Sequence, residues 1–413
     1  MESDAGRAAA RATTFPLARI FASSDFLRLW TLGLILFVVR WLEMLAMGVF
    51  VYERTGSPFL VAMIAMLRLL PMAFVGAFAG ALADRFERRN VLVAVVLCLL
   101  ATSTVLATLA MLGMLEVWHL AVATLVNGVT WSTDNPVRRI LIGEVVGADQ
   151  VGRAMSIDIG TNNASRMIGP TIGGVILATV GIHGVFALSM AFYAAGFVVA
   201  LGIRHREGIR TAAAGPLLGR IGQGIRIAAR EKRIVGALVI TVIFNVWGWP
   251  FTSMIPVIGQ DRLLLDPSGI GMLASMDGLG AFLGASLIAL LAKPRIYARL
   301  YLSGTALYLA ALPVFALVTH PVVAGAALLF TGFTGAAFMT MQSTLVYVLA
   351  PPEIRSRIFG VLSVCIGLGP LGFVHLGLLA DWIGAPSATA LIGLEGLAVL
   401  ALTRRFWLPV LRA

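Results

Sequence analysis

The chain has 413 residues, of which 59% are hydrophobic and only 12% are charged, and its mean hydropathy is +0.94. Soluble domains are about half apolar and about a quarter charged, so this composition excludes an ordinary soluble protein. The net charge of +11 could suggest nucleic-acid binding. That function needs a clustered basic face, whereas the basic residues here are spread over alternate connections between apolar runs. We therefore expect an integral protein of the lipid bilayer that does not bind nucleic acid.

Apolar runs recur along the whole chain. A helix of about 20 apolar residues crosses about 30 Å of hydrocarbon, and each run has about that length. The runs are 27–51, 59–82, 91–114, 117–142, 155–180, 184–203, 234–258, 269–291, 300–318, 321–349, 358–379 and 385–402. The sequence thus predicts an all-α membrane protein with about twelve transmembrane helices.

The distribution of arginine and lysine predicts the orientation in the membrane. Every second connection is rich in these residues, as around Arg19 before the first run and Arg204 after the sixth, and the connections between are poor in them. Because positively charged loops stay in the cytoplasm, both termini are expected there. The pattern predicts a multi-pass protein of the cell inner (plasma) membrane.

The longest polar interruption divides the runs six and six. We expect the following organisation: a cytoplasmic tail 1–24, an N-terminal six-helix bundle 25–203, a cytoplasmic linker 204–232, a C-terminal six-helix bundle 233–403 and a cytoplasmic tail 404–413. In the linker, Leu217, Ile221 and Ile225 recur at four-residue spacing. This spacing predicts an amphipathic helix on the inner leaflet, with a disordered basic loop as the alternative.

The two halves resemble copies of one unit. A shift of about 204 residues places Gly80 on Gly284 and Arg153 on Arg357. Parallel repeats of this kind are one way in which transporters build a central site that opens to either side in turn.

A short charged connection joins the second and third runs. Its conspicuous residues are Gly80, Asp84, Arg85, Arg88 and Arg89. They resemble the signature loop of the major facilitator superfamily, although Glu87 stands where that family more often has glycine. The resemblance implies two six-helix halves related by pseudo-twofold symmetry, and a cytoplasmic gate in this loop. The alternative for the arginines is that they only set the membrane topology.

A second motif lies in the fifth run and consists of Gly169, Pro170, Gly173 and Gly174. It resembles the exporter-associated motif of the same superfamily, with Ser156 and Ser165 where that motif has glycine. Proline bends a helix and small residues permit close helix packing. The resemblance implies export, and a generic small-residue helix crossing is the alternative.

The surrounding residues narrow the resemblance. Asp134, Arg138 and Arg139 in the fourth run, and Asn162 and Arg166 before Gly169, resemble the proton-driven drug and siderophore exporters. That branch includes the enterobactin exporter and macrolide efflux proteins, and lysophospholipid transporters are close to it.

Several charged residues lie inside the apolar runs, where a charge costs at least about 2.5–3.5 kcal/mol and is functional by default. The acids are Glu43, Asp134, Asp158 and Asp277, and the bases are Arg40, Arg68, Arg138 and Arg166. A proton-coupled carrier needs a buried acid, and we expect Glu43 first and Asp277 second, with a structural ion pair as the alternative for each. Asp134 and Arg138 lie four residues apart and could pair within one helix.

The substrate cavity should be mostly apolar, with a few oriented polar groups. By family resemblance, the candidates in cavity-lining spans are Trp41, Trp131, Asn245, Trp249, Met339 and Gln342. Asn245, Trp249 and Ser253 recur at four-residue spacing and should project together. Helix packing or an interfacial position is the alternative for each.

Together these features predict an alternating-access secondary transporter, a proton-coupled exporter of an amphipathic small molecule such as a drug or siderophore. The alternatives are a lysophospholipid or other lipid carrier, an ion-independent uniporter and a non-transporting membrane sensor. We expect a monomer that is not an enzyme. No cofactor or metal is expected, because the sequence has no glycine-rich nucleotide loop and its five histidines are scattered.

Overall fold

A computed structural model describes residues 18–74, 86–147, 149–205, 226, 228–351 and 354–411, and this part of the chain is helical, without strands. The N-terminal half contains α2 (Ala18–Phe21), α3 (Ser24–Thr55), α4 (Pro58–Phe74), α6 (Arg88–Met111), α7 (Val117–Val146), α8 (Val151–Thr179) and α9 (Ile182–Leu201). The C-terminal half contains α11 (Lys232–Ile243), η1 (Phe244–Gly248), η2 (Trp249–Met254), α12 (Ile255–Asp261), α13 (Pro267–Leu291), η3 (Pro294–Ile296), α14 (Tyr297–Leu317), α15 (Pro321–Leu349), α16 (Arg355–Ile366), α17 (Gly369–Ile383), α18 (Ala385–Leu402) and α19 (Arg404–Leu411).

Each predicted apolar run overlaps one of these helices or a continuous series of them. Within the described residues, nine helical stretches are long and apolar enough to cross a membrane. The three remaining runs fall on α4, which is a shorter apolar helix, and on α7 and α8, which carry several charged side chains in their interiors. The predicted all-α membrane fold is confirmed.

Helix ends follow local capping chemistry. The Ser23 hydroxyl caps α3 by accepting a hydrogen bond from the backbone N–H of Phe26 at 3.3 Å, and Gly56, whose φ of 61° favours glycine, caps the other end after Thr55. Asp266 caps α13, and hydrogen bonds from Ser268 and Gly269 hold the pKa of this exposed carboxyl below its usual range. The α3–α4 and α12–α13 connections lie at the same end of the molecule, since Tyr52 near the end of α3 contacts Asp261 at the end of α12.

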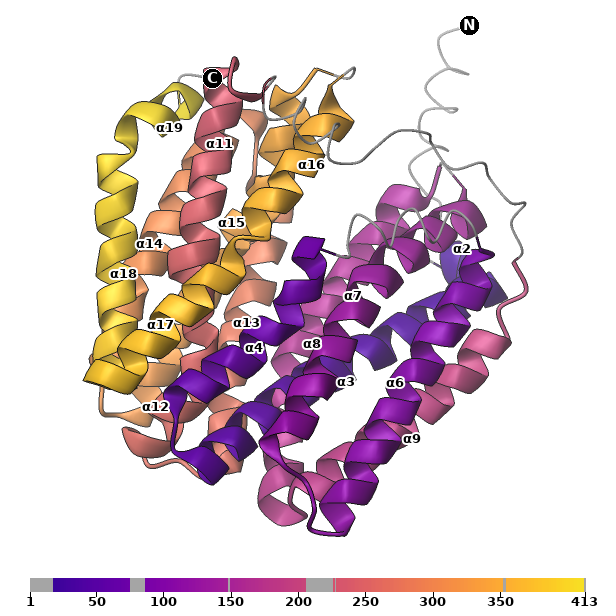
Figure 1. The fold of residues 1–413 in the computed structure, drawn as a ribbon. Coiled ribbons are helices and arrows are strands. Elements are labelled where there is room, and N and C mark those ends of the chain that lie inside the picture. Colours follow the sequence, from indigo (N-terminus) through magenta and orange to yellow (C-terminus); the bar gives the residue numbers. More distant parts are fainter. Residues whose placement is uncertain are drawn as a thin grey trace, which may run out of the picture.

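The helices form two groups side by side, α3 to α9 and α11 to α18 (Figure 1). The first and last described helices, α2 and α19, lie at the same end of the molecule, at the top of Figure 1. We call this end the termini face and the opposite end, where α12 lies, the far face.

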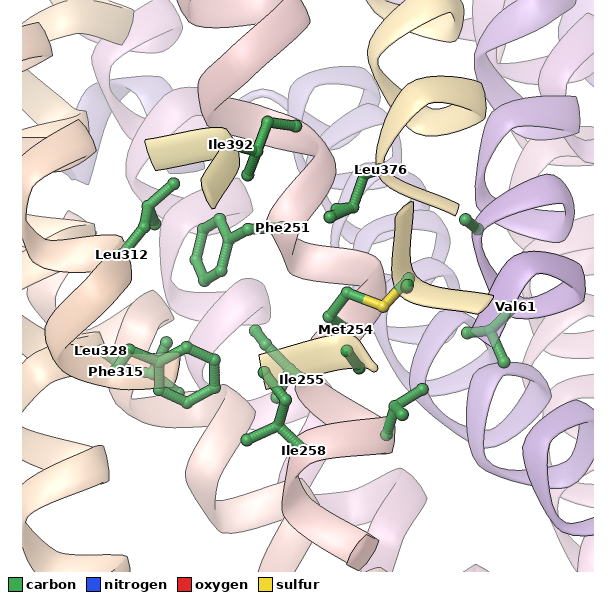
Figure 2. Packing of buried hydrophobic residues seen from close by; sticks show 14 of the residues in the cluster. Val61, Phe251, Met254, Ile255, Ile258, Leu312, Phe315, Leu328, Leu376 and Ile392 are labelled. Carbon is green, nitrogen blue, oxygen red and sulfur yellow. The ribbon is translucent and has the colours of Figure 1, made fainter. Parts of the chain in front are cut away.

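The two groups share one apolar core towards the far face. This core joins Met47 and Val61 of the first group to Met254, Ile255 and Leu376 of the second, and Figure 2 shows Val61 and Leu376 beside Met254. Towards the termini face the cores are separate. One contains only residues from Ile20 to Ile203, and another contains only residues from Ala228 to Leu362. The halves are therefore packed together at the far face and have independent interiors near the termini face.

Polar contacts reinforce the closure of the far face. The Tyr52 hydroxyl of α3 donates a hydrogen bond to Asp261 at the end of α12. The Ser57 hydroxyl, just before α4, donates to Asp381 of α17 at 3.1 Å. These bonds join the two halves at the end of the molecule where the apolar core is shared.

Candidate substrate cavity and buried charges

A cavity lies between the two halves. Its empty volume is about 900 Å³, including the part that is open to solvent. The lining residues are Trp41, Met44, Leu45, Met47, Gly48, Val61, Ile64, Ala65, Arg68, Thr124, Asn127, Arg166, Pro170, Trp249, Thr252, Ser253, Ile255, Pro256, Ala274 and Asp277. Met47, Val61 and Ile255 also belong to the shared core, so this core closes the cavity towards the far face. A mostly apolar wall with a few polar groups is typical of a small-molecule site.

Two of the predicted cavity residues, Trp41 and Trp249, line this space from opposite halves. Trp131 is not among the lining residues, and its ring lies 4.8 Å from the Arg40 guanidinium carbon. Asn245, Met339 and Gln342 also do not line it, so a role in substrate binding stays a prediction for these positions.

The predicted alignment of Asn245, Trp249 and Ser253 fails because the seventh span is not one regular helix. It changes from α-helix to a π-helical turn at η1 and then to a 3₁₀ helix at η2, so residues four apart no longer lie above one another. Pro250 contributes, since it has no backbone N–H to donate. Asn245 instead donates a hydrogen bond to the Thr241 carbonyl of its own helix at 2.8 Å. Trp249 and Ser253 still reach the cavity.

Sequence reasoning missed some residues. Asn127 and Thr252 line the cavity. Glu395, inside α18, accepts a hydrogen bond from Trp247 at 3.2 Å and lies 2.7 Å from His375. This group lines a separate groove away from the cavity. A lone acid in an otherwise apolar run was the available signal for Glu395.

The buried charges of the N-terminal half pair between helices. Asp134 of α7 accepts from Arg40 of α3 at 3.4 Å, and Arg138 of α7 pairs with Asp158 of α8. Arg139 also reaches Asp158, at 3.2 Å. The predicted pair between Asp134 and Arg138 does not form, because the two side chains are directed to different neighbouring helices. Breaking such a buried pair costs about 3–5 kcal/mol, so these contacts hold α7 against α3 and α8.

One ion pair joins the two halves. Arg166 of α8 pairs with Asp277 of α13, and both residues line the cavity. The Asp277 Oδ2 atom takes part in this pair, while its buried Oδ1 atom has no hydrogen-bond partner among the described residues. Asp158 and Arg166, which both lie on α8, thus bind opposite neighbours: α7 of the same half and α13 of the other.

Glu43 lies in a different setting. It is 2% exposed, accepts a hydrogen bond from the Ser103 hydroxyl of α6 at 2.9 Å and does not line the cavity. No ion pair of Glu43 occurs within the described residues. Of the two leading candidates for proton coupling, Asp277 faces the cavity and the other half, and Glu43 faces the interior of its own half.

The four residues of the exporter-type motif serve two helix contacts. A Cβ atom on Gly169 or Gly173 would lie 2.7 Å from Trp41 or Leu42 of α3, in the same half. A Cβ atom on Gly174 would overlap the Pro267 carbonyl oxygen at the start of α13, and the Pro170 carbonyl packs against Gly271 of α13. The motif therefore lets α8 approach α3 on one side and the opposite half on the other.

The signature loop is described only in part. Gly80, Asp84, Arg85 and the predicted linker helix lie outside the described residues. Arg88 pairs with Glu144 of α7, and Arg89 donates to the Leu201 carbonyl of α9 at 2.8 Å. These contacts connect α6 to its neighbours within one half.

The helical fold, the two packed halves and the cavity between them define a transporter of the major facilitator type. Solved structures with this fold include nucleoside transporter NupG, with a TM-score of 0.76 at 14% identity over 93% of this chain and 100% of that one. A bacterial homologue of the lysosomal transporter Spinster gives 0.70 at 15% identity over 94% and 96%.

More narrowly, the chain belongs to the transmembrane secretion effector family of this superfamily, whose model matches residues 15–413. Macrolide efflux protein A of Streptococcus pyogenes is 20% identical over 87% of this chain and 90% of its own length. Multidrug efflux pump Tap of Mycolicibacterium fortuitum is 24% identical over 81% and 84%. The Staphyloferrin A transporter of Staphylococcus aureus is 20% identical over 93% and 94%. The resemblance to drug and siderophore exporters is confirmed.

Proposed function

We propose that this protein is an alternating-access secondary transporter that exports an amphipathic small molecule, a drug or a siderophore, in exchange for protons. The observation that carries the proposal is the Arg166–Asp277 ion pair, which joins the two halves in the wall of the cavity. A carrier of this kind needs a contact between its halves that depends on protonation and on the contents of the cavity.

The termini face is proposed to be the cytoplasmic one, in agreement with the basic residues of that side. The state described by the structure is then inward-facing, because the halves share a core only at the far face. Outward opening would separate the contact of Tyr52 with Asp261 and that of Ser57 with Asp381, and would bring the termini ends of the halves together. A monomer with two six-helix bundles in the plasma membrane suffices for this cycle.

Asp277 is proposed as the coupling acid ahead of Glu43, because it alone of the two lines the cavity and contacts the other half. A proton on Asp277 removes the negative charge that Arg166 binds and so weakens the connection between the halves. Reformation of the pair in the inward-facing state expels the proton to the cytoplasm. Asp134 and Asp158 are bound by arginines within the N-terminal half and are proposed to be structural.

The substrate class follows from the cavity wall and the names of the relatives. Two tryptophans and several methionine and aliphatic side chains accept an apolar body, and a few polar groups orient it. The relatives are named for macrolides, multiple drugs and a siderophore.

The test uses purified protein in sealed vesicles with three radiolabelled compounds: a macrolide, staphyloferrin A and a lysophospholipid. We expect the macrolide or the siderophore to accumulate in vesicles with an acidic interior, because protons that leave would drive the substrate in, and accumulation should vanish when an ionophore collapses the gradient. Protein-free vesicles are the control. Movement that does not depend on the gradient would indicate a uniporter, transport of the lysophospholipid alone a lipid carrier, and binding without movement a sensor; each result contradicts the proposal.

A further inference from the structure

We infer that the substrate carries an acidic group, a carboxylate or a phosphate, and that Arg68 binds this group while the apolar body lies between Trp41 and Trp249. This inference rests on the proposed function and adds the chemical class of the substrate.

The first step is that one of the possible ion pairs between the helices does not form. The eight charged residues singled out inside the spans could form four ion pairs, and three of these pairs are present. The remaining base is Arg68 and the remaining acid is Glu43. Their side chains form no ion pair, which would need a nitrogen-to-oxygen distance of 4.0 Å or less. Glu43 is instead bound to the Ser103 hydroxyl. Arg68 is therefore a buried cation without a carboxylate in contact among the described residues.

The second step concerns the free donors of Arg68. Its side chain is 7% exposed and donates one hydrogen bond, from Nη2 to the Arg40 carbonyl at 3.2 Å. The Nε atom has no partner among the described residues. An arginine presents five donors in a planar fork and stays charged in proteins. That fork suits the two oxygens of a carboxylate or phosphate.

The third step is the position of this fork. Arg68 lines the cavity together with Trp41 and Asn127. The indole Nε1 atom of Trp41 is likewise a buried donor that has no partner among the described residues. The cavity wall holds two cations, Arg68 and Arg166, and one acid, Asp277, which Arg166 already binds. An excess of positive charge in a mostly apolar pocket favours an amphipathic anion.

The fourth step separates this site from proton coupling. Arg68 belongs to the N-terminal half, and the proposed proton carrier Asp277 belongs to the C-terminal half and is held by Arg166. The acidic group and the proton therefore bind different side chains, so an exchange of anion and proton does not require them to compete for one atom.

The experiment compares three probes with the same ring and different charge: 2-naphthoate, 2-naphthamide and 2-naphthylmethylamine. Binding to the purified full-length protein in lipid nanodiscs is measured by titration calorimetry. We expect 2-naphthoate to bind at least about 10-fold more tightly than the amide, and the protonated amine more weakly than both. In Arg68→Gln the preference for the anion should disappear, and in Arg68→Lys part of it should remain. The matched control is Arg54→Gln, at an exposed position at the far end of α3.

A second variant has the opposite expected sign. Glu43→Gln removes the unpaired carboxylate from the half that contains Arg68. Because this carboxylate repels an anion, its loss should increase the affinity for 2-naphthoate. Equal affinities for the three probes, no binding of 2-naphthoate to the wild type, or unchanged selectivity in Arg68→Gln would overturn the inference. Selective binding without movement across vesicles would sink the proposed function and leave the anion site standing. Proton-driven transport that is unchanged in Arg68→Gln would overturn the anion site and leave the proposed function standing.

Discussion

Asp277→Asn is expected to abolish proton-driven transport and to weaken the inward-facing state. The amide cannot exchange a proton, so substrate uptake into vesicles with an acidic interior should fall to the level of protein-free vesicles. The substitution also leaves the partly buried Arg166 without its partner, and the cost should stay below the about 3–5 kcal/mol that breaking a fully buried pair costs. The measurement is the initial rate of uptake with and without a pH gradient.

Two further variants separate these effects. The double variant Arg166→Gln/Asp277→Asn removes both charges, so the conformational balance should return towards that of the wild type while proton-driven transport stays absent. Asp149→Asn, at an exposed acid between α7 and α8, is the matched control and should transport normally. Gradient-driven uptake by Asp277→Asn at the wild-type rate would show that Asp277 does not carry the proton.

Gly174→Val is expected to prevent closure of the far face. Its Cβ atom would overlap the Pro267 carbonyl oxygen, and Gly271 of α13 leaves no room beside it. Backbone atoms at a helix crossing cannot move aside as a flexible side chain can, so α8 and α13 must separate. We expect the inward-facing population to fall sharply and transport to be lost, because the cycle needs both states.

The measurement for Gly174→Val is the distance between spin labels on each face, after replacement of the free Cys98 and Cys365 by serine. Labels at Ser156 and Ser363 report on the termini face, and labels at Glu53 and Trp382 report on the far face; all four residues are exposed. The far-face distance should lengthen in Gly174→Val. Ala178→Val is the control, one turn later on α8 at an exposed position. Equal distances in Gly174→Val and the control would refute the role given to this crossing.

Much of the architecture followed from the sequence because membrane helices obey a simple length and polarity rule. The twelve apolar runs overlap the observed helices, and Gly169 to Gly174 lies at a close helix crossing. Seven of the eight charged residues singled out inside the spans are buried, as their cost in a membrane suggests, and Arg166 is partly buried.

The partners of those charges could not be predicted. Sequence spacing shows only which residues share a face of one helix, and it placed Asp134 beside Arg138. The observed partners come from other helices, and Arg166 and Asp277 are 111 positions apart. The irregular turn before Pro250 likewise hid the true orientation of Asn245, because a π turn has no strong sequence signal.

The most direct measurement for the central claim, that the cavity opens to the two faces in turn, is the pair of interspin distances in the otherwise wild-type protein at neutral and at acidic pH. At neutral pH we expect a long distance between Ser156 and Ser363 and a short one between Glu53 and Trp382. We expect acidification to protonate Asp277, and so to shorten the first distance and lengthen the second in the same fraction of molecules. If both distances change in the same direction, or if neither changes, the result would contradict alternating access controlled by the Arg166–Asp277 pair.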